Sequence, residues 1–300
     1  FKLVDILNNF ILLNSLMQDQ FDDIRPFNDS EYHAVVKELL QVETLQRAIA
    51  YYLPHLSLED AQKTLQGFNG IQEFQSVIAC GIVQSIIDKS MVGFSYDGVD
   101  QLDKSDSYLL MSNHRDIVLD SALVNYCLND IKYNTCEIAI GSNLLAEPWV
   151  KKLVRLNKSF IVKRNIPKQE MLEASKNLSA YIAYALKEKK QSVWIAQREG
   201  RSKDGNDRTN PGLLKMFGLS SEGDLLQHLV NLNITPVSIS YELDPCDALK
   251  IPELKAKSKG EAYVKKEGED DLHMELGMNG PKGRTPVSYT HLRAHETDHD

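Results

Sequence analysis

The stretch YLLMSNHRDIVLD, residues 108–120, sets an apolar run directly before a histidine, an arginine and two aspartates. The run YLLM has the length and composition of a buried strand, and a helical pattern begins near Ile117. His114 is therefore expected in a strand-to-helix turn, partly exposed. Ligands of α/β sheets gather at the carboxyl ends of the strands, so this turn is the first candidate for a functional site.

The chain from residue 93 onward alternates between short apolar runs and helical stretches. We expect strands at 108–111, 137–141, 159–162, 192–196 and 234–241, with helices that include 117–130 and 167–189. Strand and helix alternation of this kind predicts an α/β fold with a largely parallel sheet flanked by helices. Residues 254–271 mix acidic and basic side chains without apolar periodicity and are expected to form a solvated loop or flap.

The chain up to residue 92 has a helical pattern instead. Residues 28–54 carry apolar side chains at helical spacing and stop at Pro54, Ser57 and Asp60 have the spacing of a capping box, and a third helix is expected near 70–89. We therefore expect an N-terminal helical domain over 1–92 and an α/β domain over 93–284.

The two ends of the sequence are unusual. Residues 285–300 share no periodicity with the preceding chain, and SYTHLRAHET resembles a peptide that arises when sequencing-adapter DNA is translated. His291 and His295 stand four residues apart, as in some metal sites, but a non-native tail is the preferred interpretation. Because the sequence starts at Phe1, we also expect the native chain to begin upstream.

Composition excludes several classes of protein. With 42% hydrophobic and 25% charged residues, the 300-residue chain is expected to be a soluble globular protein. Its net charge of −8 argues against a nucleic-acid partner, because phosphate-driven binding needs a surplus of Lys and Arg. The longest apolar stretch, 74–87, is shorter than the ~20 residues that span a bilayer. The four cysteines have no CxxC spacing and are expected to be reduced core thiols of a cytoplasmic protein.

His114 could act as a base if a carboxylate oriented its ring. Asp120 can reach back to it from the first helical turn, whereas Asp116 competes for this role but is also a natural N-cap. The alternative is an ordinary surface histidine. The letters HRDI also resemble the protein-kinase catalytic loop, but Ser121 stands where that motif needs Asn, and no G-x-G-x-x-G or D-F-G is present.

Four sequence blocks resemble those of the glycerophospholipid acyltransferases, in the same order. SNHRDIVLD (112–120) resembles the motif N-H-x-x-x-x-D, and KSFIVKR (158–164) resembles the second block, with Lys158 in place of its glycine. REGRSKDG (198–205) is similar to E-G-x-R-S, and ITPVSISYE (234–242) resembles the fourth block, which contains a proline. The resemblance covers roughly residues 75–245.

Two spacings depart from the family pattern. Five residues, rather than four, separate His114 from Asp120, a difference of about 100° around a helix. Arg201 directly follows Gly200, one residue earlier than in the family. Two alternatives therefore stay open: either Asp116 or Asp120 pairs with His114, and either Arg198 or Arg201 reaches the substrate.

The resemblance implies a role for each matched residue. His114 would be the catalytic base and Asp120 would orient it. The substrate-binding set would comprise Lys163, Arg164, Glu199, Gly200, Arg201 and Ser202. Secondary roles would fall to Asn113, Arg115, Asp116 and Pro236, although Pro236 is first expected to be an edge-strand or bulge proline.

Six basic residues and no acidic residue lie between Lys151 and Arg164. Part of this run is the second block and is expected to bind phosphate. The alternatives are a solvated helix face or, for the segment 147–158, a face that rests on anionic lipid. Core packing is the preferred explanation of Trp149.

The resemblance implies transfer of a fatty acyl group from acyl-CoA or acyl-carrier protein to glycerol 3-phosphate or lysophosphatidate. No metal or bound cofactor is expected, and the protein would be cytoplasmic and peripheral to the inner face of the cell membrane. The alternatives are a non-catalytic lipid- or acyl-carrier-binding relative, and a hydrolase that uses the same histidine and aspartate on water.

Overall fold

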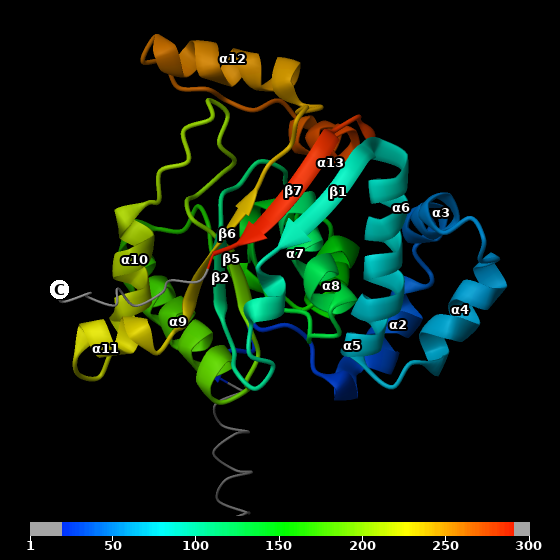
Figure 1. Ribbon diagram of the computed structural model, residues 1–300, viewed down its shortest axis with the longest axis horizontal. Helices are drawn as coiled ribbons and strands as arrows, with labels where there is room; N and C mark the ends of the chain where they lie inside the picture. The colour runs from blue at the N-terminus through cyan, green and yellow to red at the C-terminus, as the bar shows by residue number, and fades with distance from the viewer. Residues whose placement is uncertain (1–19, 291–300) are drawn as a thin grey trace, which may run out of the picture.

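A seven-stranded sheet with helices on both faces forms the centre of the computed structural model, which describes residues 20–290 (Figure 1). Its strands are β1 (Met91–Asp97), β2 (Leu109–Ser112), β3 (Glu137–Gly141), β4 (Ser159–Val162), β5 (Val193–Ala196), β6 (Ile234–Ile239) and β7 (Gly283–Tyr289). The order across the sheet is β1-β7-β6-β2-β5-β3-β4, and every neighbouring pair is parallel except β6 and β7. The predicted α/β fold class is confirmed.

The two faces of the sheet belong to two hydrophobic clusters. On one face Leu110 and Trp194 pack with α6 (Cys80–Ser90) and α7 (Leu119–Asp130). On the other face Leu109 and Val193 pack with α9 (Lys168–Lys187) and α10 (Pro211–Phe217). Adjacent residues of β2 and β5 alternate between these faces, and both faces are covered, which is why these strands are apolar throughout.

The N-terminal helices surround a third cluster. They are η1 (Asp29–Glu31), α2 (Tyr32–Leu39), α3 (Glu43–Tyr52), α4 (Leu58–Gly67), α5 (Ile71–Glu73), the π-helix η2 (Phe74–Ala79) and α6. Ser57 caps α4 by accepting the backbone N–H of Asp60, as predicted. The stretch 28–54 is broken into η1, α2 and α3, because Val42 adopts an extended conformation. Since α6 also packs on α7, these helices share a core with the sheet.

Helix α8 (Pro148–Leu156) turns its apolar side toward the N-terminal helices. Leu156 is buried, and Trp149 and Leu153 pack against the same cluster as α2, α3 and α4. The core-packing interpretation of Trp149 is therefore confirmed. Trp149 and Leu153 are partly buried by this contact, and Leu156 is fully buried. The shorter elements that complete this part of the fold are η3 (Val99–Gln101), η4 (Ser142–Leu144), η5 (Gly218–Ser220) and α11 (Leu225–Val230).

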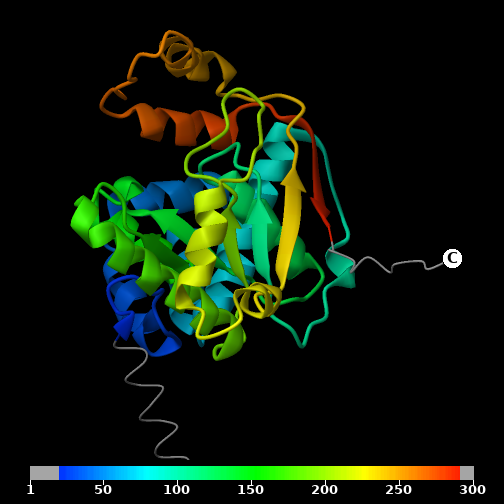
Figure 2. The same ribbon diagram turned by 90° about the vertical axis from the view of Figure 1, so that its left-hand side faces the viewer.

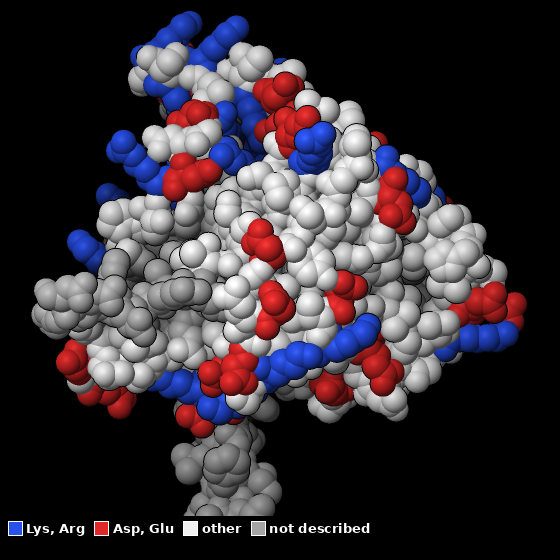
Figure 3. All heavy atoms as spheres, in the orientation of Figure 1, with Lys and Arg blue, Asp and Glu red and all other residues white. Residues whose placement is uncertain are grey.

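The region after β6 is more ordered than the sequence indicates. Residues 254–271 are expected to form a solvated loop or flap, but α12 (Asp247–Ser258) reaches into this stretch and α13 (Glu269–Asn279) begins within it. Figures 1 and 2 show α13 between α12 and the sheet. Figure 3 shows Lys and Arg side chains gathered over α12, whose last turn carries Lys255 and Lys257. The lack of apolar periodicity reflects the exposure of most of this segment.

Residues 285–289 belong to the fold, so the expected tail boundary at 285 is too early. They lie in β7, which pairs with β1 in parallel and with β6 in antiparallel register. Val287 and Tyr289 are buried in the same cluster as α6 and α7. The alternation of buried and exposed residues in this short strand was not recognised beside the unusual sequence that follows. Residues 291–300, including His291 and His295, lie outside the described residues.

Candidate active site

The strand-to-helix turn after β2 is fixed by an amide bridge. Asn113 donates from Nδ2 to the carbonyl of Ile239 at 2.8 Å and accepts the N–H of Ile239 at Oδ1, also at 2.8 Å. An asparagine side chain that makes both bonds to one residue continues the ladder between β2 and β6 by one step. The residue after Asn113 is therefore held at the end of the strand, as predicted for His114.

His114 and Asp120 form a hydrogen-bonded pair. The distance from His114 Nδ1 to Asp120 Oδ2 is 2.8 Å, and Asp120 is fully buried. The same carboxylate accepts the backbone N–H groups of Arg115 at 2.6 Å and Asp116 at 3.0 Å, and it accepts the hydroxyl of Tyr241 at 2.9 Å. Four donors to one buried carboxylate stabilise its charged form, which is the form that orients a neighbouring histidine.

The extra residue between His114 and Asp120 lies in the turn. Because α7 begins at Leu119, His114 is not on the helix, and the expected rotation of about 100° between the two side chains does not apply. The turn absorbs the insertion without separating the pair.

Asp116 caps the helix instead of contacting His114. Its Oδ1 accepts the backbone N–H groups of Val118 at 2.9 Å and Leu119 at 2.8 Å, as expected for a capping residue. Burial, with the charge of Asp120 nearby, raises the pKa of Asp116 above its usual range. Of the two candidate partners, the structure brings Asp120 to the imidazole.

A cavity of about 1910 Å³ opens beside His114 and is lined by six of the eight predicted catalytic and substrate-binding residues. Predicted site residues on its wall are His114, Lys163, Arg164, Glu199, Gly200 and Arg201. Farther along, the wall is aliphatic and comes largely from the N-terminal helices, including Leu39, Leu45, Ile49, Ile78 and Ile82. The cavity therefore has a polar part with cationic groups next to His114 and an apolar part that suits a hydrocarbon chain.

The second-block cations have different partners. Arg164 Nη1 lies 2.9 Å from Glu199 Oε2, which links the second and third blocks across the cavity wall. Lys163 Nζ lies 2.5 Å from Asp23 Oδ2, which is not one of the predicted site residues. The other basic residues of the run 151–164 are spread over the fold: Lys152 pairs with Glu38, and the partly buried Lys158 donates to Gln72 and Thr135. The run is therefore not one continuous anion-binding surface.

The third block is a loop held against the His114 turn. Ser202 donates its backbone N–H to the carbonyl of His114 at 2.7 Å, which ties the loop to the turn. Gly200 has a φ of +71°, and a Cβ there would meet nothing within 4 Å. Glycine is thus required by the left-handed backbone rather than by a close neighbour.

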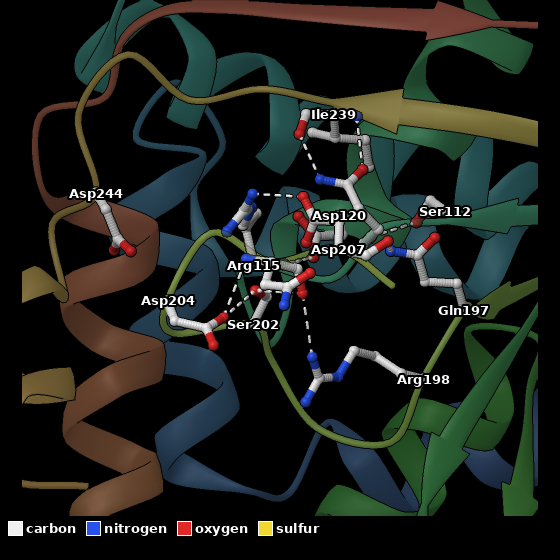
Figure 4. Close-up of polar contacts among 12 residues, drawn as sticks. Ser112, Arg115, Asp120, Gln197, Arg198, Ser202, Asp204, Asp207, Ile239 and Asp244 are labelled. Carbon is white, nitrogen blue, oxygen red and sulfur yellow. Dashed lines mark hydrogen bonds and ion pairs between the residues drawn. The ribbon is translucent and has the colours of Figure 1, made fainter. Parts of the chain in front are cut away.

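Arg115 joins the same loop from its other side. Its guanidinium forms an ion pair with Asp207 at 2.5 Å, and Figure 4 shows these two side chains pointing toward each other. Gln197 donates from Nε2 to the carbonyl of Asp207 at 2.8 Å, and Arg198 donates to the carbonyl of Asn206 at 3.2 Å. Arg115 lines a separate cavity of about 230 Å³. Its position favours fixing the loop over contacting a substrate beside His114.

Arg201 is the most buried of the basic residues predicted to bind the substrate, at 7% exposure. Its Nη2 lies 2.6 Å from His273 Nδ1 on α13, and its guanidinium lies 3.8 Å from Asp270. Arg198 also lines the large cavity, so the structure brings both candidate arginines to its wall.

Pro236 does not lie on an edge strand, because β6 has β2 on one side and β7 on the other. The pairing of β6 with β7 begins at Val237, so Pro236 lies one residue before it. The backbone N–H that proline lacks therefore removes no hydrogen bond between β6 and β7. It is absent from the residues described as lining the large cavity.

Tyr241 and His273 were not identified as site residues from sequence. Tyr241 follows β6 within the fourth block, and its hydroxyl reaches Asp120. Burial and the charge of Asp120 raise the pKa of Tyr241 well above its ordinary value, so it remains a hydrogen-bond donor. His273 lies outside every recognised block. The place of Tyr241 within the fourth block, ITPVSISYE, is the available sequence signal for this residue, and none is available for His273.

The fold and the motif-bearing turns define an α/β acyltransferase domain. Residues 93–240 match the sequence model of the Acyltransferase family, which supports the expected resemblance to the glycerophospholipid acyltransferases. No curated protein is significantly similar in sequence. One similar solved structure is the crystal structure of the 1-acyl-sn-glycerophosphate (LPA) acyltransferase PlsC from Thermotoga maritima. It has a TM-score of 0.41 and 11% identity, over 88% of this chain and 83% of that chain.

Proposed function

We propose that this acyltransferase moves a fatty acyl group from a thioester, acyl-CoA or acyl-carrier protein, to the hydroxyl of a glycerol phosphate. Glycerol 3-phosphate and lysophosphatidate are the proposed acceptors. The observation that carries the proposal is the His114–Asp120 pair at a cavity that has cationic side chains nearby and aliphatic walls beyond. The cationic part suits the phosphate, and the aliphatic part suits the acyl chain.

The reaction follows from the tautomer of His114. Asp120 accepts a hydrogen bond from Nδ1–H, which leaves Nε2 free to take a proton. As the acceptor hydroxyl attacks the thioester carbonyl, its oxygen forms the new C–O bond and its proton passes to Nε2. The tetrahedral intermediate then breaks the C–S bond, and the departing sulfur takes the proton back. Base assistance of this kind is typically worth ~10² to 10⁴ in rate.

The phosphate of the acceptor is proposed to bind Arg164 and Arg201. Both line the cavity with His114, and a guanidinium can hold two phosphate oxygens at once. Glu199 forms an ion pair with Arg164 and would compete with the phosphate for this guanidinium. Gly200 and Ser202 would shape the loop that carries Arg201.

A thioester-release assay tests the proposal. The purified protein is mixed with acyl-CoA, or with acyl-carrier protein, and with each acceptor in turn, and the acylated product is identified by mass spectrometry. Acceptor-dependent release that is lost in His114→Ala, with an unchanged circular dichroism spectrum, supports transfer. Fatty acid released without any acceptor indicates a hydrolase. No turnover together with retained lipid binding indicates a non-catalytic relative.

We further propose that the protein works in the cytoplasm at the inner face of the cell membrane, because the proposed product is a membrane lipid. Within residues 20–290, no helix combines the length and apolar character needed to cross a bilayer. Sedimentation with vesicles of anionic or neutral phospholipid tests peripheral binding. Equal recovery in the supernatant with and without vesicles would contradict it.

A further inference from the structure

Helix α13 holds the guanidinium of Arg201 through a buried histidine. His273 is 2% exposed, and its Nδ1 lies 2.6 Å from Arg201 Nη2. An arginine can only donate, so Nδ1 must be the acceptor and the ring must carry its proton on Nε2. This Nε2 is buried and has no hydrogen-bond partner among the described residues. Among residues 20–290, Arg201 is therefore the partner to which the imidazole is hydrogen-bonded.

A second contact fixes the same face of α13 against the His114 turn. Gly277 lies one helical turn after His273, and a Cβ at this position would stand 2.1 Å from Asp116 Oδ2. Only a residue without a side chain lets the helix approach so closely. Because Asp116 caps α7 beside Asp120, α13 is packed on the element that carries the proposed base.

We propose that His273 is a positioning residue that aims Arg201 at the acceptor phosphate, so that α13 completes the acceptor site. This rests on the proposed function. Helix α13 lies beyond residues 93–240, so the residue that orients this arginine comes from outside the matched segment. A guanidinium held by a fixed acceptor loses less freedom when it binds a phosphate than one that must first be ordered.

The surroundings of His273 disfavour its protonation. Burial and the nearby Arg201 lower its pKa below the usual range for histidine. The other groups that face it are Glu269, Asp270, Lys265 and, through a hydrogen bond to its backbone carbonyl, Cys246. Protonation of Nδ1 would remove the acceptor and place a second cation against the guanidinium. Binding of the acceptor should therefore weaken as His273 becomes protonated.

Two substitutions at His273 and one matched control test the inference. His273→Leu removes the acceptor, and His273→Asn places an amide oxygen near the position of Nδ1. His228→Leu is the control, since His228 is also a buried helical histidine but bonds the carbonyl of Phe217 outside the cavity. We expect His273→Leu to raise the KM for glycerol 3-phosphate roughly 10- to 100-fold, the scale of a lost buried hydrogen bond to a charged group. The KM for the donor should change less than twofold, His273→Asn should recover most of the loss, and the control should leave both KM values unchanged.

The pH dependence separates positioning from a merely structural role. The ratio of the acceptor KM of the wild type to that of His273→Asn should rise as the pH falls from 6.5 to 4.5, because only the wild type loses its acceptor by protonation and the pKa of His273 lies below its usual range. The titration of the phosphate cancels in this ratio. A flat ratio, or an acceptor KM in His273→Leu within twofold of the wild type, overturns the inference. If His273→Leu does not fold, the pH dependence of the KM ratio between the wild type and His273→Asn decides whether the inference holds.

Calorimetric binding of glycerol 3-phosphate distinguishes failure of the inference from failure of the proposed function. If the wild type transfers no acyl group but binds glycerol 3-phosphate, the proposed function fails, and weaker binding by His273→Leu supports the inference. Equal binding by the two proteins overturns it, as does absence of binding by a wild type that is also inactive with this acceptor.

Discussion

The hydroxyl of Tyr241 donates a 2.9 Å hydrogen bond to Oδ1 of Asp120, the carboxylate oxygen opposite the one that contacts His114. The two residues are 121 positions apart, so the fourth block reaches the base through the carboxylate that orients it. The phenol and the imidazole together leave the carboxylate little rotational freedom.

Tyr241→Phe should lower kcat roughly 10-fold, because one hydrogen bond to a charged group is lost while the ring is kept. The KM for the acceptor should change little, since the substitution leaves the proposed phosphate ligands in place. Steady-state kinetics with varied acceptor measures both. Tyr133→Phe is a control, because Tyr133 bonds the backbone carbonyl of Asp106 away from the site. An unchanged kcat in Tyr241→Phe would show that the hydrogen bond from Tyr241 to Asp120 does not contribute to catalysis.

Asp120→Asn should reduce kcat by ~10³-fold or more, because an amide cannot supply the charge that stabilises a protonated His114. Asp116→Asn should cost less than ~10-fold, because asparagine caps a helix as well as aspartate does. Single-turnover rates of the two variants, measured beside the wild type, compare them directly. If Asp116→Asn were the more damaging change, the pairing of His114 with Asp120 would not be the functional one.

Gly200→Ala should lower the free energy of unfolding by ~1 kcal/mol, since the φ of +71° is unfavourable for any residue with a Cβ. The alanine has no neighbour to clash with, so backbone strain is the whole cost. Gly67→Ala is the matched control: it also has open space but no positive φ, and it should be neutral or stabilising by a few tenths of a kcal/mol. Urea unfolding measures both, and equal values for the two variants would contradict this account.

The features that sequence predicted correctly are local. The apolar runs of β2, β3, β4 and β5 are short, continuous and buried on both faces, so their composition alone marks them. The turn that carries His114 and the carboxylate that orients it lie within six residues of each other, where spacing is informative. Asp116 could be identified as a cap for the same reason.

The features that sequence missed depend on contacts between distant segments. His273 meets Arg201 across 72 positions, and nothing in its own neighbourhood distinguishes it from a surface histidine. Strand β7 was assigned to a tail, because its partners β1 and β6 are what make its alternating pattern meaningful. The dispersal of the basic run 151–164 was equally hidden, since each side chain finds its partner on a different element.

The contribution of Lys158 to the free energy of unfolding should become more favourable as the pH rises from about 8 to 10.5. Its backbone is left-handed, with a φ of +53°, and its ammonium is buried and donates to Gln72 at 2.6 Å and to Thr135 Oγ1 at 3.1 Å. Burial lowers the pKa of Lys158 to about 8 from an ordinary value of 10.5. Between these two values the unfolded chain binds more protons at this residue than the folded one does, so the free energy of unfolding rises with pH, by at most ~1.4 kcal/mol per pH unit.

The variant Lys158→Met has no titratable group at this position. In urea unfolding between pH 7.5 and 10, the difference between wild type and Lys158→Met should therefore shift in favour of the wild type as the pH increases, whereas the same difference for the surface variant Lys176→Met should stay constant. A pH-independent difference for Lys158→Met would mean that the buried ammonium keeps its proton throughout this range.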